Sequence, residues 1–240
     1  KGICIIPKIE ISKYSSFQET ITALCVLKNK KYIAYGTDRG KITIADARDL
    51  HPIKTIQLPL FRTVETISYD SLRNALLISA SMLFEINLDN YAYTSLFGNV
   101  APKNIFVDKE SIFLGTMIGI LKLCYDDKPY HYKIDTAWYN NYKEWSGNRS
   151  KYGAMLHIST NKRSFDVCYD SCLQRYIGTT KAGVFTFNQH GIQELLYGGS
   201  HIYGRRTIYH RQNTYISSIN QGIYIVHQDG SVGCLNSNNA

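Results

Sequence analysis

The chain is poor in residues that interrupt strands, and it lacks the segments that mark several protein classes. Only five of its 240 residues are proline. No apolar run approaches the roughly 20 residues that a membrane-spanning helix needs. No stretch keeps the 3.6-residue apolar period of an amphipathic helix. These absences exclude a membrane-spanning helix within these residues and a helical bundle.

The familiar catalytic and nucleotide-binding motifs are also missing. There is no G-x-S-x-G elbow, no H-E-x-x-H, no P-loop and no G-x-G-x-x-G. The seven histidines are scattered along the chain, and no base accompanies Asp166 and Asp170, which flank Cys168. We therefore expect no catalytic residues, no cofactor and no metal site here. A kinase elsewhere in a longer parent chain stays compatible with this expectation.

None of the six cysteines forms a C-x-x-C pair, which argues against a zinc ribbon. Most of them fall inside apolar, strand-like runs, where a free thiol behaves as a small buried hydrophobe. We expect core thiols, and one disulfide stays open as an alternative.

The composition that is present belongs to an ordinary folded protein. Hydrophobic residues make up 44% of the chain and charged residues 19%, and there are 19 tyrosines. Tyrosine is enriched in strands, so the composition favours an all-β fold. The net charge of +8 favours anionic partners or simply keeps the surface soluble, and we do not expect nucleic acid as the partner.

An internal repeat is the main signal in the sequence. Each unit has four short strands, with a tight turn before the third, and the first strands begin near residues 21, 64, 103, 164 and 206, which gives steps of 43, 39, 61 and 42 residues. The second strands are expected at 32–37, 76–81, 112–116, 176–180 and 215–218, the third at 40–44, 82–86, 119–123, 183–187 and 222–226, and the fourth at 53–58, 91–97, 130–134, 192–197 and 232–235.

Units of this kind predict a β-propeller of four-stranded antiparallel blades. A single small sheet cannot bury both faces, but sheets arrayed around an axis bury their faces on one another. Small pairs such as Gly-Thr in the second strand suit close approach of sheets, and a glycine opening the third strand suits a positive φ.

We expect one propeller over residues 1–240, with five full blades and half of another. The half blade is 2–6 as a third strand and 8–12 as a fourth. The chain begins at Lys1 without methionine, so we expect a processed or excised piece of a longer protein, with five to seven blades in its complete form.

The run 176–187 resembles the two-component regulator propeller repeat, which reads as an aromatic, Ile-Gly-Thr, a short variable turn, Gly and an aromatic strand. Residues 113–121 and 35–40 are weaker copies, 82–86 lacks the glycine, and the tryptophan often found at the start of the motif is absent. The resemblance implies a periplasmic sensor region of a bacterial hybrid histidine kinase, many of which detect oligosaccharides. It also implies a membrane-anchored parent chain; a cytoplasmic location is the alternative.

The 61-residue step holds an inserted aromatic and basic loop, 137–163, which contains both tryptophans of the chain. Aromatic rings beside cations can bind sugar rings and acidic groups, and they can also form a hot spot for a protein partner. The alternative is that the two tryptophans only anchor the long loop. The turns between second and third strands share the face on which this loop emerges. The candidate ligand-binding residues are Trp138, Tyr139, Tyr142, Trp145, Arg149 and Lys151 in the loop, with Arg39 and Lys181 in two of those turns.

The sequence thus predicts a non-enzymatic, ligand-sensing propeller that binds an oligosaccharide or another small anionic ligand. The alternative is a WD40-like scaffold that binds a protein partner, and a propeller lyase or glycosidase comes third because a fold does not fix a function. A homodimer is compatible with either reading.

Overall fold

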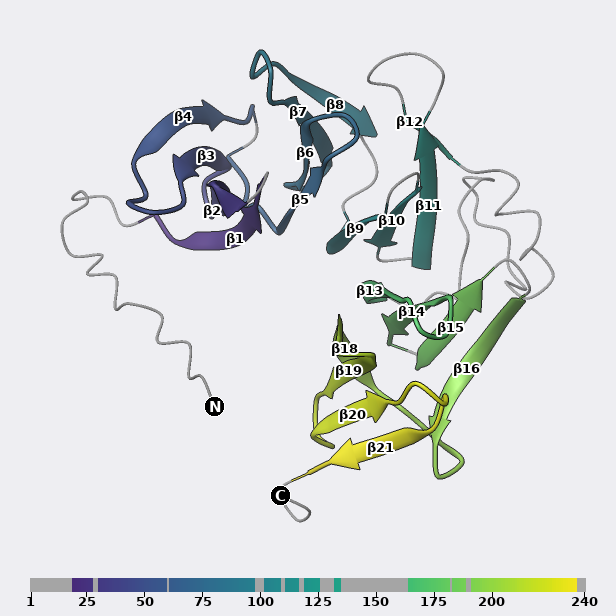
Figure 1. Cartoon of the computed structure of the whole chain (residues 1–240). Helices are drawn as coiled ribbons and strands as arrows, with labels where there is room; N and C mark the ends of the chain where they lie inside the picture. The colour runs from purple at the N-terminus through teal and green to yellow at the C-terminus, as the bar shows by residue number, and fades with distance from the viewer. Residues whose placement is uncertain are drawn as a thin grey trace.

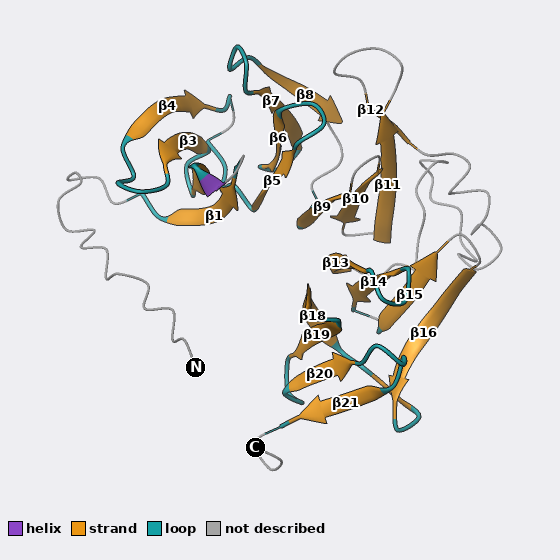
Figure 2. Ribbon diagram, viewed as in Figure 1, coloured by secondary structure: helices purple, strands orange, loops and turns teal. Residues whose placement is uncertain are grey.

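The computed structural model describes residues 19–27, 30–59, 61–97, 102–108, 111–116, 119–125, 132–134, 164–181, 183–188 and 191–236. In these residues the chain forms five antiparallel sheets, each made of consecutive strands (Figures 1 and 2). They contain no α-helix, and the short purple segment in Figure 2 is a 3-10 turn at Lys30. No helix in this part of the chain is long and apolar enough to cross a membrane.

The first three sheets have four strands each. Sheet 1 contains β1 (Ile21–Val26), β2 (Tyr32–Thr37), β3 (Lys41–Asp46) and β4 (Pro52–Gln57). Sheet 2 contains β5 (Thr66–Asp70), β6 (Ala75–Ser79), β7 (Leu83–Asn87) and β8 (Tyr93–Phe97). Sheet 3 contains β9 (Asn104–Asp108), β10 (Ser111–Thr116), β11 (Gly119–Tyr125) and β12 (Tyr132–Ile134).

The last two sheets follow the same order. Sheet 4 contains β13 (Ser164–Asp170), β14 (Arg175–Thr180), β15 (Val184–Asn188), β16 (Gly191–Tyr197) and the short β17 (Ser200–His201). Sheet 5 contains β18 (Gly204–His210), β19 (Asn213–Ser218), β20 (Ile223–Val226) and β21 (Val232–Leu235). The predicted all-β propeller with five four-stranded blades is confirmed, and β17 is an addition that the repeat did not predict.

The sheets stand one after another around an arc, with their first strands on the inner side and their fourth strands outside (Figure 1). Contacts between neighbours run from β1 to β5, β5 to β9, β9 to β13 and β13 to β18. In the described residues, sheets 1 and 5 are the two ends of this arc, so each has one face without a neighbouring sheet (Figure 1).

The hydrophobic core is divided among the interfaces between sheets. One cluster joins sheets 1 and 2, a second joins sheets 2 and 3, a third joins sheets 3 and 4, and a fourth joins sheets 4 and 5. Phe113 and Phe187, both almost fully buried, make an edge-to-face contact in the third cluster, with ring centroids 5.7 Å apart. Stability therefore comes from face-to-face burial between sheets, as the repeat requires.

Glycine in the second strand allows these close approaches. A Cβ at Gly36 would lie 2.5 Å from Cγ1 of Val64, in the segment that leads into β5, and one at Gly178 would lie 2.6 Å from Cδ1 of Ile120 in sheet 3. The glycines that open third strands do not all share one conformation. Gly40 and Gly222 have positive φ, as expected. No positive φ is found at Gly183, where a Cβ would meet mainly Oε1 at the flexible end of the Glu194 side chain.

The hairpin after the first strand repeats closely in sheets 2 and 4. Asp70 Oδ1 accepts hydrogen bonds from the backbone N–H groups of Leu72 and Arg73, and Asp170 Oδ1 caps its own turn in the same way. Asn74 and Gln174 close the two turns at positive φ. Asp side chains favour such turns because they replace a backbone acceptor.

Cys168 is buried as predicted, but Cys172 lies in the exposed turn of sheet 4, so a core position was wrong for that residue. Cys25, Cys168, Cys172 and Cys234 are free thiols. The predicted half blade at 2–6 and 8–12 and the loop 137–163 lie outside the described residues and remain predictions.

Candidate functional site

Six of the eight predicted ligand-binding residues lie outside the described part of the chain. They are Trp138, Tyr139, Tyr142, Trp145, Arg149 and Lys151. The structure therefore tests only Arg39 and Lys181, which lie in the turns between the second and third strands of sheets 1 and 4.

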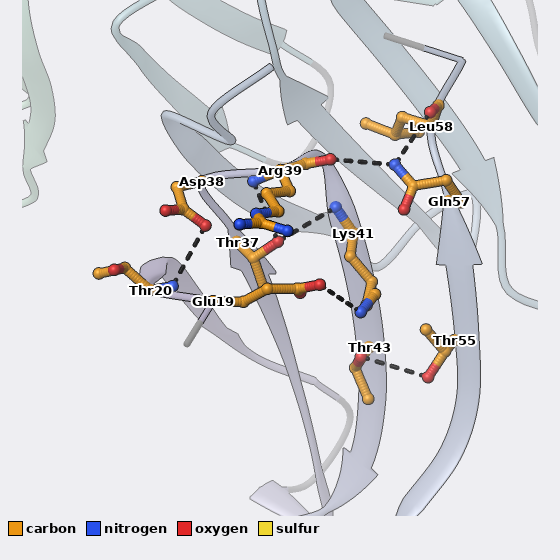
Figure 3. A network of polar contacts seen from close by, with 10 residues as sticks. All are labelled: Glu19, Thr20, Thr37, Asp38, Arg39, Lys41, Thr43, Thr55, Gln57 and Leu58. Atoms are coloured by element: carbon orange, nitrogen blue, oxygen red, sulfur yellow. Dashed lines mark hydrogen bonds and ion pairs between the residues drawn. The ribbon is translucent and has the colours of Figure 1, made fainter. Parts of the chain in front are cut away.

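Arg39 sits in a turn with a well-fixed backbone (Figure 3). Thr37 Oγ1 accepts hydrogen bonds from the N–H groups of Arg39 and Lys41, both at 3.3 Å, and Gln57 Nε2 donates to the Arg39 carbonyl at 3.0 Å. Glu19 pairs with Lys41 at 2.6 Å on the neighbouring side of the turn. The Arg39 residue itself is exposed, so the turn presents this cation to solvent.

Lys181 occupies the corresponding turn of sheet 4, and there the surroundings differ. It borders a hollow of about 790 Å³ between sheets 4 and 5, on the side where second strands end. The lining residues are Phe165, Thr180, Lys181, Tyr203, Gly204, Arg205, Ser218, Ile219, Asn220 and Gln221. The structure thus places one of the two testable candidates at a cavity and the other on open surface.

The sheet 4 side of the hollow presents a cation held against an aromatic ring. The guanidinium carbon of Arg205 lies 4.1 Å from the centroid of the Phe165 ring. Thr179 Oγ1 donates to the Arg205 carbonyl at 3.3 Å, which ties the start of sheet 5 to sheet 4. Stacking on a ring orients the planar guanidinium and leaves its edge donors available to an anion.

Hydrogen bonds join the two described residues on either side of Lys181. The Thr180 N–H donates to the Gly183 carbonyl at 2.8 Å, and the Gly183 N–H donates to Thr180 Oγ1 at 3.2 Å. Thr180 and Gly183 are buried while Lys181 is exposed. Lys181 is therefore held between buried neighbours and is itself open to solvent.

The sheet 5 side supplies neutral polar groups. Gln221 accepts a hydrogen bond from the Tyr224 hydroxyl at 2.5 Å, and its own N–H donates to Ser218 Oγ at 2.8 Å. Tyr203, at the rim, is half exposed. Among the described lining residues there are two cations and no carboxylate, so the hollow favours a ligand with negative charge and hydroxyl groups.

Sequence reasoning missed Phe165, Tyr203, Arg205, Asn220 and Gln221. A signal was available, because Arg205 and Arg206 form a basic stretch with no acid beside them in the sequence. The pattern did not reveal that Phe165, which comes 40 positions before Arg205, lies under its guanidinium.

A smaller hollow between sheets 1 and 2, of about 220 Å³, is lined mainly by aliphatic and tyrosine side chains. Asn74, one of its few polar residues, is already bonded to Asp89 and Tyr69. The described residues that line this hollow include no charged side chain, although Lys31 and Lys54 lie over the outer tyrosines, so we favour the hollow that Lys181 and Arg205 line.

The buried acids among the described residues differ in how their oxygens are satisfied. Asp166 Oδ2 accepts the Thr207 N–H at 2.9 Å, and burial raises the pKa of Asp166. Burial also raises the pKa of Glu85 to about 7, and its Oε2 has no hydrogen-bond partner. Within the described ranges, no three His, Cys, Asp or Glu side chains are grouped as metal ligands.

No family model and no curated protein matches this sequence. Solved structures do match the fold. The extracellular domain of the hybrid two-component system BT3049 from B. thetaiotaomicron superposes with a TM-score of 0.66 at 13% identity, over 92% of this chain and 28% of that one. The extracellular domain of the hybrid two-component system BT4673 from the same organism gives 0.64 at 16% identity, over 91% and 28%.

A propeller of another kind is also similar. The β-propeller domain of Cps50 (Swd1) from Myceliophteria thermophila gives a TM-score of 0.60 at 9% identity, over 89% of this chain and 68% of that one. The chain thus spans 28% of each of the two extracellular domains. At these identities the comparisons establish the fold alone: the described sheets are a β-propeller arrangement.

Proposed function

We propose that this chain is a non-enzymatic recognition module of an extracellular or periplasmic two-component sensor. Its ligand is a glycan-like or otherwise anionic small molecule, bound in the hollow between sheets 4 and 5. The observation that carries the proposal is the pairing of Arg205, stacked on Phe165, with Lys181 at a cavity of about 790 Å³.

The chemistry of the hollow suits an acidic sugar. A guanidinium with free edge donors takes a carboxylate or sulfate in a bidentate way, and an ammonium adds a point charge. The half-exposed Tyr203 ring offers an apolar face to a sugar ring, while Asn220 and Gln221 provide amide groups for hydroxyls. A cavity of this size accommodates a mono- or disaccharide.

The sensor part of the proposal has independent support from fold likeness. Two of the similar structures are extracellular domains of hybrid two-component systems. The repeat at 176–187 resembles the propeller repeat of the same class of receptor, and Lys181 lies within it. In this reading the chain is one propeller portion of a longer, membrane-anchored receptor.

Calorimetric titration of the chain with uronate-containing and matched neutral oligosaccharides tests the proposal. We expect acidic oligosaccharides to bind, and Lys181→Ala and Arg205→Ala each to weaken binding by about tenfold, because each removes a charged contact. Arg48→Ala is the matched control: Arg48 is an exposed cation on sheet 1, paired with Asp46. Equal affinity of all variants, or no binding of any acidic sugar, would overturn the proposal.

The aromatic loop is tested in the same titration. If Trp138→Ala and Trp145→Ala weaken binding while Lys181→Ala does not, the ligand belongs to the loop 137–163 and the hollow is not the site. If only Lys181→Ala and Arg205→Ala weaken binding, the hollow binds the ligand without a contribution from the two tryptophans of the loop.

A scaffold that binds a protein is the second candidate function. Ile219, 57% exposed, and Tyr203, 50% exposed, both line the hollow and offer apolar surface to a partner. The similarity to the Cps50 (Swd1) propeller supports this reading at the level of fold. Binding of a protein that Ile219→Asp abolishes and acidic sugars do not displace would favour it.

A further inference from the structure

A second hollow lies between sheets 4 and 5, where β16 and β21 meet (Figure 1). Its volume is about 540 Å³, and Arg175 lines it from the start of β14. Lys181, which borders the first hollow, follows the other end of the same strand. At roughly 3.3 Å per residue the two cations are about 20 Å apart along the strand, so the two hollows are separate places.

Arg175 faces sheet 5 from a position that is small or neutral in other sheets. It lies two residues before Ile177, which is fully buried in the cluster between sheets 4 and 5, and alternate residues of a strand share a face. The hairpin registers place Ala75, Ser111 and Asn213 at the same position in sheets 2, 3 and 5. The fold does not need a guanidinium there, so its presence in sheet 4 calls for another explanation.

The edge of this guanidinium that suits a carboxylate has no partner. Nε and Nη2 of Arg175 are both buried, and neither makes a hydrogen bond to the described residues. These two nitrogens lie side by side on one edge of the planar group, and their N–H groups point the same way. That edge matches the two oxygens of a carboxylate, which accept two parallel hydrogen bonds.

Asp170 lies in the same interface but does not use these donors. Its Oδ1 accepts the backbone N–H groups of Cys172 and Leu173, and its Oδ2 accepts the Thr214 hydroxyl at 3.3 Å. Burial lowers the pKa of Arg175, and the charge of Asp170 opposes that shift. Buried donors without acceptors cost free energy in the folded chain, and an anion that accepts from both would offset this cost.

The rest of the lining suits a small acid with one negative charge. Glu194 also borders the hollow, and its Oε1 is bonded to His201 Nδ1 at 2.5 Å. A ligand with several negative charges would be repelled by this carboxylate, whereas a single charge is balanced by Arg175. Gln193 offers an amide to a hydroxyl group, and the ring of Tyr197, 40% exposed, offers an apolar face.

We propose that this second hollow, called here the Arg175 hollow, binds a small hydroxylated monocarboxylate whose two carboxylate oxygens accept from Nε and Nη2 of Arg175. Gly198 and Gly230 line it from two turns, and no described residue lies within 4 Å of a Cβ built on either, which leaves room for the ligand. Both donors are shielded from solvent, so binding includes a rotation of the Arg175 side chain toward the hollow.

NMR titration of the full 240-residue chain with lactate tests the proposal, and lactamide is the matched neutral probe. In a chain labelled with ¹⁵N-arginine, the Nε–H signal that disappears in Arg175→Ser belongs to Arg175. We expect lactate to shift this signal to saturation, and lactamide to bind at least about tenfold more weakly because it lacks the charge. An unshifted signal, or equal binding of lactamide, overturns the proposal.

The stability of Arg175→Ser separates binding from a structural role. Ser111 holds this position in sheet 3, so we expect the variant to fold. Lactate is expected to raise the urea midpoint of the unsubstituted chain and to leave that of the variant unchanged, because only the first binds it. Without lactate the variant is expected to be at least as stable, since a buried cation without acceptors is gone. A less stable variant, with no lactate effect on the unsubstituted chain, makes Arg175 a structural residue and overturns the proposal.

Lys181→Ala and Arg205→Ala are the controls that separate this site from the hollow proposed for acidic sugars. We expect both variants to lose affinity for acidic sugars and to keep the lactate shift of the Arg175 signal. If Arg205→Ala abolishes lactate binding and Arg175→Ser does not, lactate belongs to the other hollow, and this inference alone is overturned.

Inorganic phosphate at pH 8 tests the class of ligand. It carries more than one negative charge at this pH, so repulsion by Glu194 is expected to make it bind more weakly than lactate. If phosphate shifts the Arg175 signal at lower concentration than lactate does, the hollow is a phosphate site and the carboxylate proposal is wrong.

Discussion

The interface between sheets 4 and 5 and the interface between sheets 2 and 3 each bury a hydrophobic cluster, but their buried carboxylates differ in hydrogen bonding. In the first, Asp166 and Asp170 reach across to the Thr207 N–H and the Thr214 hydroxyl. In the second, Glu85 is 3% exposed beside Leu77 and Leu83, and its Oε2 has no hydrogen-bond partner.

The repeat therefore determines which strands meet between neighbouring sheets. It does not determine how the buried polar groups at each interface are hydrogen-bonded. Sheets 2 and 3 are held mainly by aliphatic packing, with Leu77, Leu83, Ile112, Leu114 and Leu123 all fully buried. Sheets 4 and 5 add hydrogen bonds to carboxylates, although Arg175 there has two buried donors without a partner and burial lowers its pKa. The hollow that we propose as the ligand site lies at the more polar of the two interfaces.

The largest loss of stability is expected from Leu77→Ala, which truncates a side chain in the aliphatic interface between sheets 2 and 3. Leu77 is fully buried between sheets 2 and 3. Its truncation removes apolar contacts and leaves a cavity, which costs about 2–5 kcal/mol of the free energy of unfolding. Chemical denaturation measures this loss. Cys168→Ala, at the other interface, serves as the control and should cost clearly less, because it removes a single sulfur atom; equal losses would contradict the comparison.

Much of this architecture is predictable from the sequence because the repeat places a strand wherever short alternating runs recur. The predicted third strand at 183–187 is observed at Val184–Asn188, and the predicted first strand near residue 164 begins at Ser164. Cross-sheet pairs are not predictable in this way. Nothing local in the sequence places Phe165 under Arg205 or Asp166 against Thr207, because each pair joins two sheets separated by about 40 residues.

Glu85→Gln is the next largest change, and its effect depends on pH. Burial raises the pKa of Glu85 to about 7, with Arg73 lowering it and Asp70 raising it. The folded chain therefore holds a proton between the ordinary pKa of 4.5 and about 7 that the unfolded chain releases. For this group, stability is highest below pH 4.5, falls as the pH rises to about 7, and stays reduced above it.

Glu85→Gln removes this cost, since the amide keeps the shape without the charge. We expect the variant to gain on the order of 2–3 kcal/mol at pH 8 and to gain little at pH 4. Denaturation curves at pH 4 and pH 8 measure the difference in stability between the variant and the original chain. An equal gain at the two pH values, or a loss at pH 8, would show that Glu85 is ionised and well solvated in the folded protein.

Asp166→Ala gives the smallest of the three effects and probes the polar interface directly. The Thr207 N–H loses its acceptor, and a buried donor left unsatisfied costs about 1–3 kcal/mol. Part of that loss is offset, because burial raises the pKa of Asp166 and its charged form is itself unfavourable there.

Asp166→Asn is the informative companion, since an amide oxygen can accept the same hydrogen bond without the charge. If carboxylates at this interface act as acceptors, the asparagine variant retains most of the stability at pH 7 and the alanine variant does not. Equal losses for both would instead mean that the negative charge matters through its attraction to Arg206, which lowers the Asp166 pKa.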